Sequence, residues 1–232
     1  DVKKIRTILD DLGRSDIRVL EDASQAHGAR LDGYLPGHYG DVATFSFFPG
    51  KNLGAYGDAG AIISNDDDFA KKSRMYANHG ALVKHEHIIE GINSRLDGLQ
   101  AAILSAKLPH ILNWSDKRLE IAMKYNDLLS DCNHIECPII HNQVKHVFHL
   151  YVIRTKNRDF VQNKLKEKGV STGIHYPTPL PFLKAYEYLR HQTSDFPISY
   201  NYSKEILSLP IYPEMSNESI DYVVDVIKSC NC

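Results

Sequence analysis

Apolar residues at the start of the chain recur at helical spacing and then give way to a short apolar run. Four of them repeat every three to four positions: Ile5, Ile8, Leu9 and Leu12. Gly13 follows as a helix stop, and residues 17–20 predict a short buried strand that ends at the polar pair 21–22. A helix that leads straight into a strand is half of an α/β repeat. We therefore expect an α/β fold in which the strand that would open the first repeat is missing.

The rest of the chain continues the alternation of strands and helices. Helical patterns with good helix formers or acidic starts occupy 66–78, 96–129 with a break at Pro109, 159–168 and 217–228. Strand patterns occupy 42–47, 61–63, 146–155 and 208–211. A glycine-rich stretch separates the first two of these strands, and a proline-rich passage runs from Pro177 to Pro181. We place a domain boundary near Leu108, inside the long helical stretch.

Composition narrows the class of protein. The 232 residues are 43% hydrophobic and 24% charged, which excludes a disordered, collagen-like or coiled-coil chain. No apolar run approaches the ~20 residues of a membrane span, and the first residues lack the apolar core of a signal peptide. Lysine and arginine number 27 against 29 acidic residues, so nothing favours binding to nucleic acid or to a membrane surface.

The cysteine and histidine counts bear on the cellular setting and on metal binding. Four cysteines are too few for a disulfide framework, so we expect a reducing, cytoplasmic setting. Twelve histidines are scattered without the regular spacing of metal ligands, so we expect no metal site.

Lys51 is the first candidate for chemistry. It follows a predicted strand and a Pro49-Gly50 turn, where an amine can be held rigidly and partly removed from water. Partial burial lowers the pKa of an ammonium group, and the neutral amine is a nucleophile. The alternative is an ordinary solvated lysine in a loop.

Asp22 is the second candidate. It stands at the C-terminal end of a predicted strand, the edge of an α/β sheet at which ligands gather, and Gln25 follows three residues later. The alternative is that its carboxylate caps the next turn. Together with Ser46 and Lys51, however, Asp22 supplies what a pyridinium cofactor needs. A carboxylate keeps the ring nitrogen protonated, a lysine forms a Schiff base, and a hydroxyl binds a phosphate.

Five segments carry a more specific signal, in the order 21–29 (EDASQAHGA), 45–61 (FSFFPGKNLGAYGDAGA), 91–97 (GINSRLD), 175–177 (HYP) and 208–214 (SLPIYPE). In order and spacing they resemble the pyridoxal-phosphate nucleotide-sugar aminotransferases of the DegT/DnrJ/StrS group. The resemblance implies an aspartate-aminotransferase-like fold. Residues 1–108 would be the C-terminal part of an incomplete α/β/α large domain that binds the cofactor, and 109–232 a small C-terminal α/β domain.

The resemblance also assigns roles around the cofactor, pyridoxal 5'-phosphate. Lys51 carries it as a Schiff base and moves the proton during amino transfer. Asp22 pairs with the pyridine nitrogen, Gln25 hydrogen-bonds the ring hydroxyl, and Ser46 binds the phosphate.

Four more roles follow from the resemblance. Asn93 reaches the phosphate of the cofactor in the neighbouring subunit, which implies a homodimer with shared active sites. Arg95, His175 and Tyr176 face the substrate. The planar, permanently charged fork of an arginine suits a diphosphate.

The implied reaction is transfer of an amino group, from glutamate, to the keto-sugar of a nucleotide-diphosphate sugar. Residues 93–102 are most similar to members that act on 3-keto sugars. Two features depart from the family: no phosphate turn or stacking aromatic precedes residue 1, and Pro181 and Leu183 stand where the family has histidine and glutamine.

Two alternatives stay open. One is a truncated paralogue without activity that serves as a partner protein. The other is a pyridoxal-phosphate sugar dehydratase, a branch in which histidine replaces the lysine, so that Lys51 argues against it.

Overall fold

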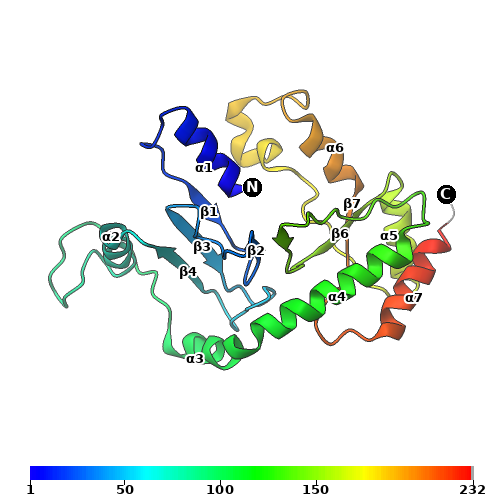
Figure 1. Ribbon diagram of the computed structural model, residues 1–232, viewed down its shortest axis with the longest axis horizontal. Coiled ribbons are helices and arrows are strands. Elements are labelled where there is room, and N and C mark those ends of the chain that lie inside the picture. The colour runs from blue at the N-terminus through cyan, green and yellow to red at the C-terminus, as the bar shows by residue number, and fades with distance from the viewer. Residues whose placement is uncertain (231–232) are drawn as a thin grey trace. The chain divides into compact units, whose positions relative to one another are not determined.

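A three-stranded sheet forms the centre of the first part of the chain in the computed structural model, which describes residues 1–230 (Figure 1). The strands are β1 (Leu20–Asp22), β3 (Val42–Ser46) and β4 (Gly60–Ser64), in the order β1-β3-β4. β1 is parallel to β3, and β4 is antiparallel to it. The register places Asp22 opposite Thr44, so the ends of β1 and β3 lie at the same edge.

Helices and short strands surround this sheet: α1 (Val2–Asp11), β2 (Arg30–Leu31), α2 (Asp67–Ala77), α3 (Gly98–Lys107), the 3-10 turn η1 (Leu108–His110) and β5 (Val144–Lys145), which pairs with β2. Aspartates begin three of the helices. Asp1, Asp66 and Asp97 each accept a hydrogen bond from a backbone N–H in the first turn.

The remaining elements are α4 (Ile111–Leu129), β6 (Tyr151–Arg154), α5 (Arg158–Glu167), the 3-10 turns η2 (Leu180–Phe182) and η3 (Lys184–Leu189), α6 (Pro197–Glu205), β7 (Ile206–Leu209) and α7 (Asn217–Lys228). β6 and β7 pair antiparallel. Beside them Tyr125 and Tyr151 stack with ring centroids 4.8 Å apart, and each hydroxyl has a hydrogen-bond partner. The aromatic pair therefore buries its polar ends without an unsatisfied group.

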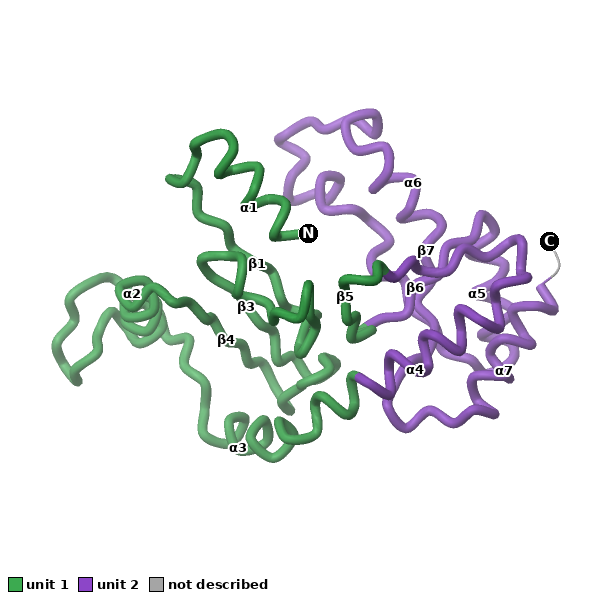
Figure 2. Tube along the Cα trace, viewed as in Figure 1, with its two compact units in different colours: residues 1–115, 141–149 green, residues 116–140, 150–232 purple. Residues whose placement is uncertain are grey.

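The chain divides into two units (Figure 2). Unit 1 contains residues 1–115 and also 141–149, and unit 2 contains 116–140 and the residues from 150 onward. The chain therefore enters unit 2 within α4, returns to unit 1 for nine residues, and leaves it again. The division into a large and a small domain at residue 108 remains a prediction.

The predicted helices are confirmed, including the break at Pro109, which lies in the 3-10 turn between α3 and α4. The first strand is not where the sequence predicts it. It begins at Leu20 rather than Ile17, and Leu20 is 60% exposed rather than buried. Asp41 explains the shift, because its carboxylate accepts the backbone N–H of Val19 at 2.7 Å and so delays the ladder.

Two other strands are also shorter or displaced. Of the strand predicted at 146–155, only Tyr151–Arg154 forms. His146 accepts the backbone N–H of Phe148 at 3.0 Å, and Phe148 has a φ of +38°, so a local turn replaces the ladder there. The strand predicted at 208–211 ends at Leu209, because Pro210 has no N–H to donate.

Candidate active site

Three predicted site residues follow the ends of neighbouring strands in unit 1. Asp22 is the last residue of β1 and Ser46 the last residue of β3. The backbone N–H of Ala23 donates to Thr44 at 2.9 Å, which joins the two strands beyond Asp22. The chain then turns directly from Ser46 into the loop that carries Lys51.

The lysine loop, residues 48–57, is closed by its own backbone. Lys51 N–H donates to the Phe48 carbonyl at 2.8 Å, and Ala55 N–H donates to the Phe47 carbonyl at 2.8 Å. At Gly54 a Cβ would lie 2.3 Å from the Pro49 carbonyl oxygen, so only glycine fits this close approach. Lys51 is half-buried.

The Asp22 carboxylate is held in its charged form. Its Oδ1 accepts the backbone N–H of Ser24 at 3.0 Å. Hydrogen bonding from Ser24 lowers the pKa of Asp22, and the charge of Lys51 lowers it further. The turn-capping alternative for Asp22 is therefore correct for one oxygen.

His27 is a buried residue of this region whose position the sequence does not reveal. Its side chain is 5% exposed and packs against Phe45 and Phe47, with ring centroids 5.5 and 5.6 Å away. Neither ring nitrogen has a hydrogen-bond partner among the described residues. Burial lowers the pKa of His27 and the Lys51 charge adds to that effect, while the backbone of Ser46 opposes both.

This histidine is expected to make the protein sensitive to acid. An unfolded histidine binds a proton near its ordinary pKa of 6.5, whereas the folded one does so only at lower pH. The unfolded state therefore binds more protons, and the free energy of unfolding falls as the pH drops below about 6.5. Urea unfolding of His27→Phe should show a weaker decline than wild type, and exposed His141→Phe should leave the decline unchanged. If the free energy of unfolding declined equally with falling pH in all three proteins, the role given to His27 would be contradicted.

Asn93 and Arg95 lie on an exposed extended segment that follows α2. Backbone bonds fasten this segment, with Ile92 N–H to Tyr76 and Ser94 N–H to Ala77. Arg95 Nε donates to Asn93 Oδ1 at 3.2 Å. The structure therefore brings the side chains of Asn93 and Arg95 into contact. The Asn93 side chain is exposed.

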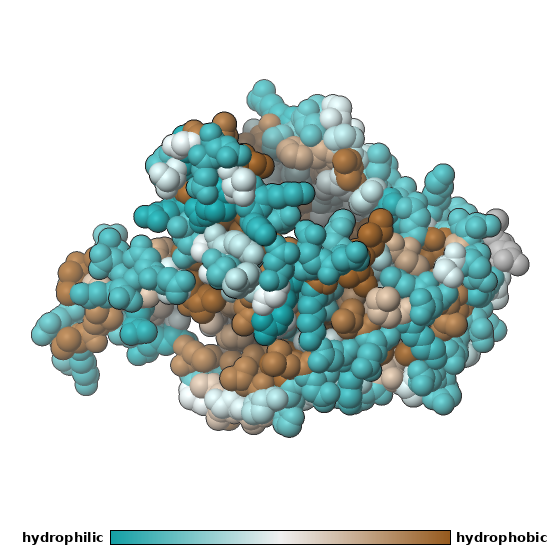
Figure 3. All heavy atoms as spheres, in the orientation of Figure 1, coloured by the Kyte–Doolittle hydropathy of each residue, from teal (hydrophilic) through white to brown (hydrophobic). Residues whose placement is uncertain are grey.

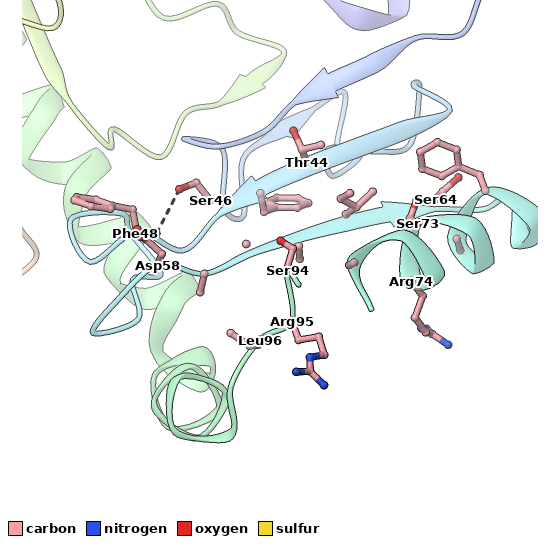
Figure 4. Close-up of a pocket in the computed structure, with 18 residues that line it drawn as sticks. Thr44, Ser46, Phe48, Asp58, Ser64, Ser73, Arg74, Ser94, Arg95 and Leu96 are labelled. Carbon is pink, nitrogen blue, oxygen red and sulfur yellow. Dashed lines mark hydrogen bonds between the residues drawn. The ribbon is translucent and has the colours of Figure 1, made fainter. Parts of the chain in front are cut away.

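A cavity of about 800 Å³ lies over β3, β4 and α2, and Ser46 and Arg95 both line it (Figure 4). The Ser46 hydroxyl accepts the backbone N–H of Phe48 at 3.3 Å. Figure 4 shows the Arg95 guanidinium turned away from the sheet. Asp22, Gln25 and Lys51 do not line this cavity.

His175 and Tyr176 belong to unit 2. His175 Nδ1 lies 2.8 Å from Ser208 Oγ, and its ring meets Tyr176 edge-on. Both side chains line a largely apolar cavity of about 710 Å³. Leu183 also lines it.

Neither a cluster of metal-ligating side chains nor a helix long and apolar enough to cross a membrane occurs among residues 1–230. Within the same residues Cys132 and Cys137 are free thiols.

Comparison with solved structures defines the class of protein. A crystal structure of DesV from S. venezuelae, in complex with a ketimine intermediate, superimposes with a TM-score of 0.94 at 36% identity. It matches 99% of this chain and 61% of the DesV chain. NtdA from Bacillus subtilis, solved with bound cofactor PMP, superimposes with a TM-score of 0.84 at 31% identity, over 98% of this chain and 52% of that one. The fold is thus the α/β fold of pyridoxal-phosphate aminotransferases, present in part.

Residues 1–228 match the model of the DegT/DnrJ/EryC1/StrS aminotransferase family, and the chain belongs to that family. The erythromycin biosynthesis sensory transduction protein EryC1 of Saccharopolyspora erythraea is 41% identical over 99% of this chain and 62% of its own. The dTDP-3-amino-3,6-dideoxy-alpha-D-galactopyranose transaminase of Aneurinibacillus thermoaerophilus is 44% identical over 91% of this chain and 58% of its own. The chain spans about three-fifths of the length of these relatives.

Proposed function

We propose that the protein transfers an amino group, from glutamate, to the keto-sugar of a nucleotide-diphosphate sugar, with pyridoxal 5'-phosphate attached to Lys51. The observation that carries this proposal is the placement of Asp22 and Lys51 beyond one edge of the sheet. Asp22 ends β1, and the loop that carries Lys51 follows Ser46, the last residue of the neighbouring strand β3. When bound, the cofactor supplies an electron-withdrawing ring that stabilises negative charge on the reacting carbon.

The residues at this edge fit the cofactor in their chemistry. Asp22 has a lowered pKa and stays ionised at neutral pH, as pairing with a protonated ring nitrogen requires. Lys51 offers a half-buried amine on a loop that its glycines hold tightly. Ser46 offers a hydroxyl that can donate to a phosphate, because it serves as the acceptor in its hydrogen bond with the Phe48 N–H. Gln25 is exposed and has an amide for the ring hydroxyl.

In this mechanism each residue of the chain has a stated task. Asp22 holds the proton on the ring nitrogen, and Gln25 orients the ring. Lys51 Nζ would hold the cofactor and, as a free amine, would accept a proton from the substrate carbon and donate it back during amino transfer. Ser46 fixes the phosphate end. Arg95, His175 and Tyr176 are proposed to bind the sugar and its diphosphate.

Trapping the cofactor tests the proposal directly. Borohydride converts the C=N bond between an amine and pyridoxal phosphate into a stable C–N bond. Peptide mapping of the reduced protein should place the adduct on Lys51, and Lys51→Ala should carry none. An adduct on a different lysine, or none in wild type, would overturn the assignment.

The position of amination is proposed to be carbon 3. The activities for which two relatives are named support it. One is the Aneurinibacillus enzyme named above. Another is the UDP-N-acetyl-3-dehydro-alpha-D-glucosamine 3-aminotransferase of Acidithiobacillus ferrooxidans, 37% identical over 91% of this chain and 57% of its own. Intact Asp22, Gln25, Ser46 and Lys51 argue against a non-catalytic paralogue, and a lysine rather than a histidine at position 51 argues against a dehydratase.

The active form is proposed to be a homodimer in which Asn93 completes the partner's site. Exposed apolar side chains flank Asn93 in the loop after α2, among them Val83, Ile88 and Ile92, with Ile88 71% exposed. Figure 3 shows apolar atoms at this end of unit 1 and again over α3, where Leu99 is exposed. Apolar patches of this kind mark protein interfaces, and a second copy of the chain fits the role given to Asn93.

A further inference from the structure

The loop that carries Lys51 is fastened to the rest of unit 1 by side chains that the proposed chemistry does not use. Asn52, directly after the lysine, is 6% exposed. Its Nδ2 donates to the Val147 carbonyl at 2.9 Å, and its Oδ1 lies 3.3 Å from His149 Nδ1. A fully buried amide with both ends bonded fixes the backbone on one side of Lys51.

Helix α3 holds the other side of the loop. Lys107, in its last turn, donates from Nζ to the Gly54 carbonyl at 2.7 Å and lies 4.6 Å from the centroid of the Tyr56 ring. Gln100 accepts the backbone N–H of Tyr56 on Oε1 at 2.8 Å. Gln100 and Lys107 are seven residues apart, two turns of one helix, so both face the loop.

Apolar packing and glycine positions agree with these contacts. Leu104, between the two polar residues, is buried in one cluster with Leu53 and Ala55 of the loop. A Cβ at Gly57 would lie 3.3 Å from the Gln100 amide, so the loop is shaped to admit that side chain. One face of α3 thus contacts the loop through apolar, hydrogen-bonded and cation–π contacts.

We propose that Asn52, Gln100 and Lys107 are positioning residues that hold the Lys51 amine in place for reaction with the cofactor. The inference rests on the proposed function, because it takes Lys51 as the reacting amine. Lys107 carries the clearest test, since its ammonium group donates to a loop carbonyl three residues from Lys51.

The test follows the reaction of the whole protein with pyridoxal phosphate by absorbance, with the adduct mapped after borohydride. Lys107→Met keeps the length of the side chain and removes its donor, and it should slow formation of the Lys51 adduct about tenfold. It should also shift the pH midpoint of the adduct's absorbance, because the amine is no longer held in one position. Lys107→Arg restores a donor and should recover both values. Lys117→Met, which removes an exposed lysine of α4, is the matched control and should behave as wild type.

Gln100→Leu and Gln100→Glu form a second pair. Leucine removes the acceptor for Tyr56 N–H and should slow the adduct, whereas glutamate keeps an acceptor and should recover the rate. Wild-type rates and midpoints in both Lys107→Met and Gln100→Leu would overturn the positioning role. So would a loss of thermal stability with an unchanged midpoint in the folded variants. Absence of an adduct on Lys51 in wild type would instead overturn the proposed function, so the two failures are distinguishable.

Discussion

Replacing Asp22 with asparagine is expected to lower turnover by two to four powers of ten while the cofactor stays bound. An asparagine amide can still hydrogen-bond the ring nitrogen, but it supplies no negative charge to keep that nitrogen protonated. The loss corresponds to about 3–5 kcal/mol of transition-state stabilisation. Steady-state kinetics of Asp22→Asn, with cofactor content measured by absorbance, check the result.

Gln25→Ala is the matched control. It removes one neutral hydrogen bond three residues away and should cost on the order of 1 kcal/mol. Equal losses in the two variants, or near wild-type turnover in Asp22→Asn, would show that Asp22 does not face the ring nitrogen. The low pKa of its carboxylate would then reflect the hydrogen bond from Ser24 and the charge of Lys51, without a role toward the cofactor.

Mixing two inactive variants is expected to restore activity. A Lys51→Ala homodimer lacks the reacting amine, and an Asn93→Ala homodimer lacks the residue proposed to reach across the interface. A heterodimer of the two has one site with both residues intact and one with neither. After random exchange half of the dimers are heterodimers, so about a quarter of the wild-type activity should return.

Subunit exchange needs its own control. Mixing Lys51→Ala with Asp22→Asn should restore nothing beyond the residual activity of either homodimer, because both residues are assigned to the same subunit's site. Recovery in that mixture, or full activity of a monomer in light scattering, would remove the shared-site proposal.

The sequence predicts the helices of this chain better than its strands. Helices carry their own boundary signals, such as the aspartates that cap α2 and α3, and these act within one turn. Strand limits depend on partners far away in the sequence. The start of β1 is set by Asp41, 22 positions after Val19, and no local pattern contains that contact.

The residues of the candidate site also differ in whether the sequence alone can predict them. Asp22, Ser46 and Lys51 could be found because each lies at or just after the end of a strand. Asn52 and Lys107 could not, since an amide and an amine acquire a role only through what the fold sets against them. The roles of Asn93, Arg95, His175 and Tyr176 remain predictions, because each depends on a cofactor, a substrate or a second subunit.

The return of residues 141–149 to unit 1 has a consequence for synthesis. Val147, which accepts the Asn52 amide, is made 95 residues after it. At about 5–20 residues per second, the ribosome takes roughly 5–20 s to cover that distance. During this interval the Val147 carbonyl that accepts the Asn52 amide has not yet been made. Residues 116–140 of unit 2 are made before it. The lysine loop is therefore among the last parts of unit 1 to be completed, and a chain that ends before residue 147 lacks the carbonyl that accepts the Asn52 amide.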